Sequence, residues 1–399
     1  MSMSFEPGAA LPEGFIPLSV PLLGGNEWKY VKQCLDANWI SSSGLFIEQF
    51  EANIAEYVGA KYAVAIVNGT SALHIALMVT GVKPGDEVIL PSLTFIAPAN
   101  AVRYAGAWPV FMDVEPDYWQ IDPQKMADFL KNECVRRDGA LYNKLTGRRV
   151  KAIMPIHILG HPCDMTPIME LAHQYELVVL EDATESLGAK YKGVKVGNIG
   201  DIACFSFNGN KVITTGGGGM IVTNNEDWAR KSRYLVTQAK DDPVEYVHNE
   251  IGYNYRLTNV QAAIGIAQLE RLEDFIASKR RIADTYTREL AGTAGITMMK
   301  ESPDVFSIKW LSTILVDPEK YGLHWRELLK KLSEEKIQTR PLWQPMHLSP
   351  AHRDSQSYKI EVADRIHSMA LSLPSSVSMK DEELARVIET IKRNSERVG

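Results

Sequence analysis

Short, apolar segments with the composition of buried strands alternate with helical segments between residues 62 and 180. Strands that are apolar along most of their length are typical of a parallel sheet whose two faces are both covered. The alternation therefore predicts an α/β fold, with a large domain built on a mostly parallel sheet flanked by helices. The expected strands are 62–67, 87–90, 110–113, 151–155 and 177–180, and the helices between them are 71–79, 97–104, 124–132 and 165–174.

The remaining segments predict the division into domains. With 399 residues, the chain exceeds a single typical domain, and two cores are expected. Helical spacing from 257 to 290 predicts one helix long enough to bridge them. We predict an N-terminal arm at 1–25, a large domain at 26–270 and a smaller α/β C-terminal domain at 271–399. Other expected elements are helices 27–37, 46–58, 325–335 and 380–394 and strands 306–316 and 338–340.

Composition excludes several classes of protein. The formal net charge of -6 gives no basic footprint, so nucleic acid is not an expected partner. No apolar run reaches the roughly 20 residues of a membrane-spanning helix. The four cysteines are scattered without a C-x-x-C pair, which argues against a metal site and suits a reducing compartment. The chain is expected to be a cytoplasmic globular protein without a metal or a membrane partner.

A lysine and an acid indicate the chemistry. Lys211 ends the segment from Phe205 and precedes four glycines, and Asp182 ends an apolar strand. Pyridoxal phosphate needs an amine that forms a Schiff base and a carboxylate that keeps its pyridine nitrogen protonated. Taken singly, a buried lysine can be paired and an acid after a strand can cap a helix. Together, Lys211 and Asp182 indicate pyridoxal phosphate as the cofactor.

Two further segments fit the same cofactor. Gly69-Thr70-Ser71 follows the first strand and opens a helix, where unpaired N–H groups and the helix dipole attract an anion. A simple helix cap is the alternative for this segment. Phe95 follows the second strand and could lie flat on a cofactor ring, although a core aromatic is the more common fate of such a residue.

Considered together, these segments resemble the sugar-nucleotide aminotransferases of the DegT/DnrJ/EryC/StrS type. The resemblance extends from about Pro21 to the final helix. It implies the fold type I of pyridoxal phosphate-dependent aminotransferases. The matching segments are Gly69-Thr70-Ser71, Thr94-Phe95, Glu181-Asp182-Ala183, Ser206 to Lys211 and Gly252 to Arg256.

A narrower resemblance concerns the substrate. Four segments are similar to the subgroup that aminates UDP-linked 4-keto-6-deoxy-N-acetylhexosamines, in legionaminic acid and bacillosamine-type pathways. This resemblance implies a UDP-sugar substrate in the synthesis of bacterial surface polysaccharide or lipopolysaccharide. The segments are Asn208 to Lys211, Gly216 to Met220, Thr237 to Pro243 and Asn143 to Arg149.

The resemblance also implies the roles of the cofactor-binding residues. Lys211 would bind the cofactor and move the proton, and Asp182 would pair with the pyridine nitrogen. Phe95 would stack on the ring. Asn254 would reach the phosphate from a second subunit, so a homodimer with shared active sites is expected. The phosphate would be held within one subunit by Gly69, Thr70, Ser71 and Ser206.

Other residues are weaker candidates. Glu185 stands where many relatives place His or Gln against the cofactor, so it either binds the cofactor, contacts substrate or is neutral through burial. His157 matches a loop that lines the active site of relatives, and a structural histidine is equally compatible. Arg256 is a candidate for the carboxylate of the amino donor on charge alone. Trp343 and His347 lie in a segment that approaches the sugar or nucleotide in relatives.

The expected reaction is a ping-pong transamination. L-Glutamate would load its amino group onto the cofactor, which would pass it to the 4-keto carbon of the nucleotide sugar. A dehydratase of the same fold is the nearest rival, but that branch has a histidine in place of the lysine. A non-catalytic sugar-nucleotide regulator is disfavoured by the joint presence of Lys211, Asp182, Ser206 and Asn254. A phosphate-loop hydrolase is rejected because no Gly-Lys-Ser/Thr follows the glycines.

Overall fold

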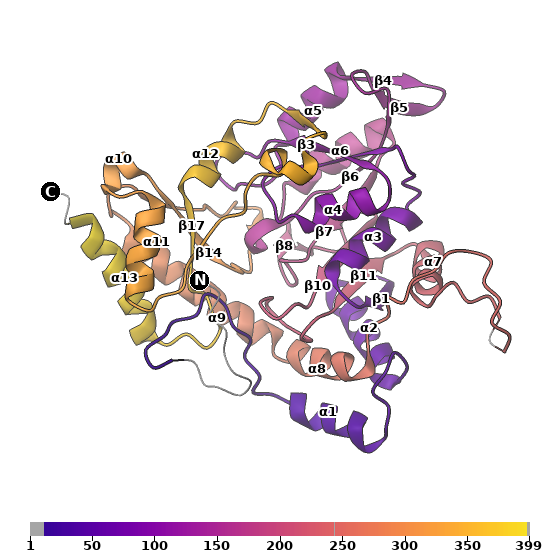
Figure 1. The fold of residues 1–399 in the computed structure, drawn as a ribbon, viewed down its shortest axis with the longest axis horizontal. Coiled ribbons are helices and arrows are strands. Elements are labelled where there is room, and N and C mark those ends of the chain that lie inside the picture. The colour runs from indigo at the N-terminus through magenta and orange to yellow at the C-terminus, as the bar shows by residue number, and fades with distance from the viewer. Residues whose placement is uncertain (1–11, 243, 397–399) are drawn as a thin grey trace.

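The computed structural model describes residues 12–242 and 244–396, and Figure 1 shows its architecture. A ten-stranded sheet forms the centre of the larger part. Along the main order of this sheet, the neighbouring strands from β10 to β16 are parallel, and β11 pairs antiparallel with β1 and β10. The main order is β1 (Tyr62–Ile66), β11 (Gly219–Thr223), β10 (Ile202–Ser206), β7 (Val178–Asp182), β6 (Arg149–Ile153), β2 (Glu87–Pro91), β3 (Trp108–Met112) and β16 (Gln356–Tyr358). The hairpin β4 (Cys134–Arg137) and β5 (Ala140–Asn143) extends from β6.

Alternate residues of the strands face opposite sides of the sheet, and both sides are covered. Val88 and Leu90 of β2 belong to one buried core, whereas Ile89 belongs to another. This confirms the mostly parallel sheet predicted from continuous apolar strands. The covering helices are α2 (Leu45–Val58), α3 (Gly69–Val79), α4 (Ala97–Tyr104), α7 (Glu226–Val236) and α8 (Asn259–Leu269) beside the first core and α5 (Pro123–Asn132) and α6 (Met165–Tyr175) beside the second. Helix α1 (Glu27–Asp36) packs on α8.

A second, antiparallel sheet has its own core. Figure 1 shows α11 and α13 gathered at one end of the molecule, next to β14 and β17. The arm residue Ile16 joins this core through a bridge to Ile337, while residues 1–11 of the predicted arm lie outside the described residues. The elements are β12 (Ile296–Met298), β14 (Ser312–Val316), β17 (Ala370–Leu373) and β15 (Arg340–Pro341), with α9 (Leu272–Leu290), α10 (Pro318–Tyr321), α11 (Trp325–Glu334) and α13 (Asp381–Glu396).

Some segments from the C-terminal third return to the large sheet. β16 pairs with β3, and α12 (Val362–Met369) contributes Ala363 and Ile366 to the first core. A small third sheet pairs β13 (Val305–Phe306) with β8 (Lys190–Tyr191), which pairs with β9 (Val194–Lys195). Because these segments lie beyond residue 270 and yet pack on the large sheet, the domain boundary at residue 270 stays a prediction. In the described part of the chain, no helix has the length and apolar character needed to cross a membrane.

Two predicted elements are divided in the structure. The helix predicted over 257–290 is two helices, α8 and α9, separated at Glu270–Arg271. The strand predicted over 306–316 is β13 and β14, because the residues between them pair with a loop. There, Ile308 and Trp310 donate their N–H groups to the carbonyls of Gly160 and Leu159.

Candidate active site

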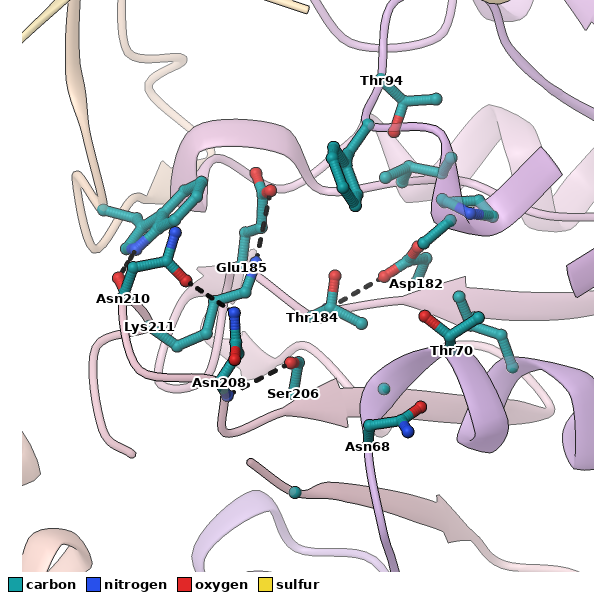
Figure 2. A pocket seen from close by; sticks show the side chains of 18 of the residues that line it. Asn68, Thr70, Thr94, Asp182, Thr184, Glu185, Ser206, Asn208, Asn210 and Lys211 are labelled. Carbon is teal, nitrogen blue, oxygen red and sulfur yellow. Dashed lines mark hydrogen bonds and ion pairs between the residues drawn. The ribbon is translucent and has the colours of Figure 1, made fainter. Parts of the chain in front are cut away.

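A cleft of about 250 Å³ lies where the central strands end. β2, β7 and β10 are parallel, so their carboxyl ends meet at one edge of the sheet, the usual place for a ligand in an open α/β fold. Figure 2 shows Glu185 and Lys211 on one side of this cleft and Asp182 and Thr70 on the other. Eight of the predicted site residues line the cleft: Gly69, Thr70, Phe95, Asp182, Glu185, Ser206, Lys211 and Trp343.

Lys211 lies in a turn after β10, where its N–H donates to the carbonyl of Asn208 at 3.0 Å. Its amine is 3.4 Å from Glu185 Oε1, and its side chain is 13% exposed. Glu185 is held in turn by the N–H of Leu159, which donates to Oε2 at 2.9 Å. Burial is the largest influence on Glu185, and it raises the pKa of this carboxyl against the opposing effect of Lys211. The amine thus reaches the cleft beside an acid that burial favours in its neutral form.

Asp182 ends β7 and is 1% exposed. Its Oδ1 accepts the N–H of Thr184 at 3.0 Å, whereas its buried Oδ2 has no hydrogen-bond partner among the described residues. Burial raises the pKa of the carboxyl, against the opposing effects of Thr184 and Lys211. A buried oxygen without a partner is costly. A cationic N–H donor in the cleft, such as a protonated pyridine nitrogen, would satisfy it.

The first turn of α3 forms an anion cradle next to Asp182. Asn68 caps the helix, and its Oδ1 accepts the N–H of Ser71 at 2.8 Å. The N–H of Ser71 is therefore used within the chain, and Gly69 and Thr70 face the cleft instead. A Cβ on Gly69 would lie 2.9 Å from the Cβ of Ser206, so only glycine leaves this space open. The cradle suits a phosphate group.

Phe95 is 53% exposed, although it follows a fully buried strand. It lines the cleft rather than the core, so the core alternative considered from the sequence does not apply. Its stacking on a cofactor ring stays a prediction.

The cleft thus brings together four groups. They are the Lys211 amine, the unpartnered buried oxygen of Asp182, the exposed ring of Phe95 and the anion cradle at the first turn of α3. The residues present therefore fit pyridoxal phosphate.

His157 does not line the cleft, contrary to the possible substrate contact. It is fully buried, its Nδ1 accepts the N–H of Cys163 at 3.0 Å, and its Nε2 lies 3.1 Å from Glu181. Because Nδ1 accepts a hydrogen bond, the imidazole is neutral and Nε2 donates to Glu181. The backbone N–H of His157 donates to the backbone carbonyl of Asp182 at 3.0 Å. His157 thus has the structural role that the sequence left open.

His347, Asn254 and Arg256 also lie outside the lining of the cleft. His347 Nδ1 is 2.7 Å from Ser92 Oγ, and Nε2 is 3.3 Å from Asp364. Asn254 is exposed, and its backbone forms an isolated antiparallel β-bridge with Thr237. The backbone of Arg256 forms another such β-bridge with Ile66. Within one chain, none of the three is brought to Lys211.

Twelve other residues also line the cleft, and the sequence analysis assigned none of them a role in the site; Asn68, Thr184 and Trp310 are three of them. A signal existed for Asn68, because asparagine immediately before Gly69 is a preferred helix cap. No local signal existed for Trp310, which lies about a hundred residues beyond Lys211 and reaches the cleft through the loop before β14.

The segment from Asn143 to Arg149 has a structural explanation. Asn143 is fully buried and donates to Glu87 at 2.8 Å and to Gln356 at 2.6 Å. Thr146 also donates to Glu87, at 2.7 Å. Asn143 and Thr146, which belong to one of the four segments of the narrower resemblance, therefore have a structural role around buried Glu87. In the segment from Thr237, Pro243 lies outside the described residues. Over the described ranges, no group of three or more His, Cys, Asp or Glu could hold a metal ion.

The fold and the cleft define the class of protein: a fold type I pyridoxal phosphate-dependent enzyme. The sequence profile of the DegT/DnrJ/EryC1/StrS aminotransferase family matches residues 21–392, and the chain belongs to this family. It is a pyridoxal phosphate-dependent sugar aminotransferase.

Relatives and solved structures agree with this assignment. The GDP-perosamine synthase of Escherichia coli O157:H7 is 41% identical over 94% of this chain and 98% of its own. That of Caulobacter vibrioides is also 41% identical, over 94% of this chain and 97% of its own. Among solved structures, DesV of S. venezuelae, in complex with a ketimine intermediate, has a TM-score of 0.83 and 30% identity, covering 94% and 95% of the two chains.

Proposed function

We propose that this chain transfers the amino group of L-glutamate to the 4-keto carbon of a nucleotide-linked 4-keto-6-deoxyhexose, for polysaccharide synthesis. The observation that carries the proposal is the cleft in which Lys211 stands opposite the unpartnered oxygen of Asp182. When bound, pyridoxal phosphate carries the amino group between the two substrates and delocalises electrons.

The residues of the chain supply binding and proton transfer. Lys211 Nζ takes a proton from the donor carbon and returns one to the acceptor carbon. Asp182 holds the pyridine nitrogen in its protonated form, and the first turn of α3 binds the phosphate. Glu185, 3.4 Å from the amine, orients Lys211 toward the cleft.

The nucleotide and the sugar are the finer part of the proposal. The two GDP-perosamine synthases favour a GDP-linked 4-keto-6-deoxyhexose. The UDP-linked 4-keto-6-deoxy-N-acetylhexosamine expected from the sequence remains the second candidate, supported by the segments Asn208 to Lys211 and Gly216 to Met220. Asn208, Asn210 and Lys211 line the cleft, so this likeness falls where the substrate would react.

We also propose that the enzyme is a homodimer with shared sites. Large apolar side chains are exposed on α1, at the start of α2 and before α8: Trp28 is 77% exposed, Leu45 78%, Tyr246 86% and Ile251 82%. A second copy would cover such side chains. Asn254 lies in the same stretch as Ile251 and is exposed, so it could reach the partner's cleft. A cytoplasmic location likewise stays a proposal.

Product analysis tests the proposed substrate. The holoenzyme would be incubated with L-glutamate and, separately, with GDP-, UDP- and dTDP-linked 4-keto-6-deoxy sugars, and the products would be separated and weighed by mass spectrometry. We expect an amino sugar from the GDP-linked substrate. A preferred UDP-linked N-acetylhexosamine would establish the second candidate, and no amination of any of them would refute the proposal.

A further inference from the structure

Trp310 brings an aromatic surface to the reactive amine from a distant part of the chain. It lies in the loop between β13 and β14, is 3% exposed and lines the cleft. The amine of Lys211 is 4.3 Å from the centroid of its ring. An ammonium over an indole face is attracted to the ring's electrons, and tryptophan gives the strongest such contact.

The position of Trp310 is fixed by hydrogen bonds at three atoms. Its Nε1–H donates to the carbonyl of Asn210 at 2.8 Å, next to Lys211 in the chain. Its backbone N–H donates to the carbonyl of Leu159 at 3.1 Å. Its own carbonyl accepts from Lys279 Nζ at 2.9 Å. A side chain held in this way offers the amine a rigid surface.

We infer that Trp310 is a positioning residue that holds the Lys211 amine in the cleft, between its indole face and Glu185. Among the described residues, the Lys211 amine has two partners, the Glu185 carboxyl at 3.4 Å and the indole ring of Trp310. Together they restrict where the amine lies before it meets the cofactor. The inference rests on the proposed function only in taking Lys211 as the reactive amine.

A purely structural role is the competing explanation, since Trp310 is also part of the first buried core. The two explanations differ in what happens to Lys211. If Trp310 only packs, its replacement lowers stability and leaves the reactivity of the amine unchanged. If Trp310 positions the amine, its replacement frees the amine and increases its reactivity in a folded protein.

Chemical labelling of the full-length, cofactor-free protein distinguishes them without any sugar substrate. Brief treatment with acetic anhydride, followed by peptide mass spectrometry, gives the labelling rate of Lys211 relative to exposed Lys320. We expect Trp310→Leu to accelerate Lys211 labelling about fivefold, the size of a partly buried cation–π contact. Trp310→Phe keeps an aromatic face but loses the indole N–H, so we expect about a twofold increase.

Trp325→Leu is the matched control. Trp325 is 6% exposed and has the Arg326 guanidinium 4.4 Å from its ring centroid, but it belongs to the core of the second sheet. This variant should leave Lys211 labelling unchanged. The visible circular dichroism of the cofactor-loaded protein should change in the Trp310 variants and not in the control.

Unchanged Lys211 labelling in folded Trp310→Leu would overturn the inference. If that variant does not fold, Trp310→Phe decides in the same way. Because neither readout uses a nucleotide sugar, a failure here is separable from a failure of the proposed function, which the product analysis alone reports.

Discussion

Asp182 is the residue whose surroundings most clearly require a partner. Its carboxyl is buried, and Thr184 satisfies only one of its oxygens. Burial of a carboxyl without hydrogen-bond partners costs free energy, and a positively charged donor at Oδ2 would recover part of that cost. Lys211 does not supply the charge, because its nearest carboxyl oxygen belongs to Glu185.

Asp182→Asn tests this assignment. The substitution keeps the volume of the side chain but removes the charge that holds the pyridine nitrogen protonated. We expect turnover to fall on the order of 10² or more, as for other preorganised charges. Asp201 comes just before β10, at the end of this strand that is away from the cleft. Asp201→Asn is therefore the control, and its turnover should remain within about twofold of wild type. Steady-state rates at saturating glutamate give the comparison, and equal rates in the two variants would refute the role.

The sequence was sufficient to predict several of these residues and insufficient for others. Asp182 ends an apolar strand and Gly69 opens a helix, so local pattern places both at one edge of a parallel sheet. His157 was ambiguous because its partner, Glu181, is defined only by the folded arrangement. Trp310 had no local signal because its position depends on hydrogen bonds to Leu159 and Asn210.

Close approach between β11 and the start of α3 shapes the anion cradle. A Cβ on Gly219 would lie 2.6 Å from the backbone of Asn68 and 2.8 Å from the nitrogen of Gly69. Any side chain at Gly219 must therefore displace the first turn of α3. The glycine run, to which the sequence alone assigned no steric role, thus has a steric function at Gly219.

Gly219→Ala should weaken cofactor binding. We expect the dissociation constant for pyridoxal phosphate to rise at least about tenfold, equivalent to about 1.4 kcal/mol. Gly209→Ala is the matched control, because nothing lies within 4 Å of its added Cβ. Absorbance titration of the cofactor-free proteins measures both constants. The same constant in the two variants would contradict the steric argument.

The helix α9 contains a buried lysine that links separate segments. Lys279 is 1% exposed, and its Nζ donates to the carbonyls of Trp310 and Ser375 at 2.9 and 2.8 Å. Burial lowers the pKa of Lys279 to about 7. A neutral amine has two N–H groups, and both are used here. Between pH 7 and about 10.4, the unfolded chain therefore holds a proton that the folded chain lacks.

Stability should rise with pH across this range because of Lys279. The unfolded state binds more protons, so the free energy of unfolding increases with pH, by up to about 1.4 kcal/mol per unit. Lys279→Met removes this dependence, and the advantage of wild type over the variant should grow from pH 7.5 to 9. Urea unfolding measures it, with exposed Lys320→Met as the control. A difference independent of pH would contradict the lowered pKa.

Elements were predicted best where they are local and periodic. The alternating strands and helices before residue 180 match the structure closely, because each strand is buried on both faces. The break between α8 and α9 was not predicted because no glycine or proline marks it in the sequence. It is set by packing, since α8 packs on α1 and α2 whereas α9 packs on β14 and α13. β16 was missed because it pairs with β3, which lies almost 250 residues earlier in the sequence.

At the scale of the whole molecule, the proposed homodimer determines whether each site is complete. Between α7 and α8, the described residues 237–242 and 244–258 project from the body of the fold in Figure 1. In the sequence, Asn254 belongs to this segment and precedes α8 by a few residues. An isologous two-fold interface places the same patch of each chain against the other's site. Asn254 would then contribute to the site whose Lys211 belongs to the partner.

A mixed dimer tests this sharing. Lys211→Ala and Asn254→Ala homodimers each carry one lesion in every site. In the heterodimer, one site carries both lesions and the other carries none. Co-refolding the two variants should therefore restore activity toward half that of wild type in the heterodimer fraction. Activity of the mixture equal to the average of the two parents would show that Asn254 acts within its own subunit.

Transfer of labelled nitrogen tests the central claim most directly. The holoenzyme would be given ¹⁵N-labelled L-glutamate and the GDP-linked 4-keto-6-deoxyhexose, with Lys211→Ala as the control. The account predicts one ¹⁵N atom bonded to C4 of the sugar, an equal amount of 2-oxoglutarate, and neither product from the variant. A dehydrated sugar without nitrogen, or the same labelled product from Lys211→Ala, would contradict it.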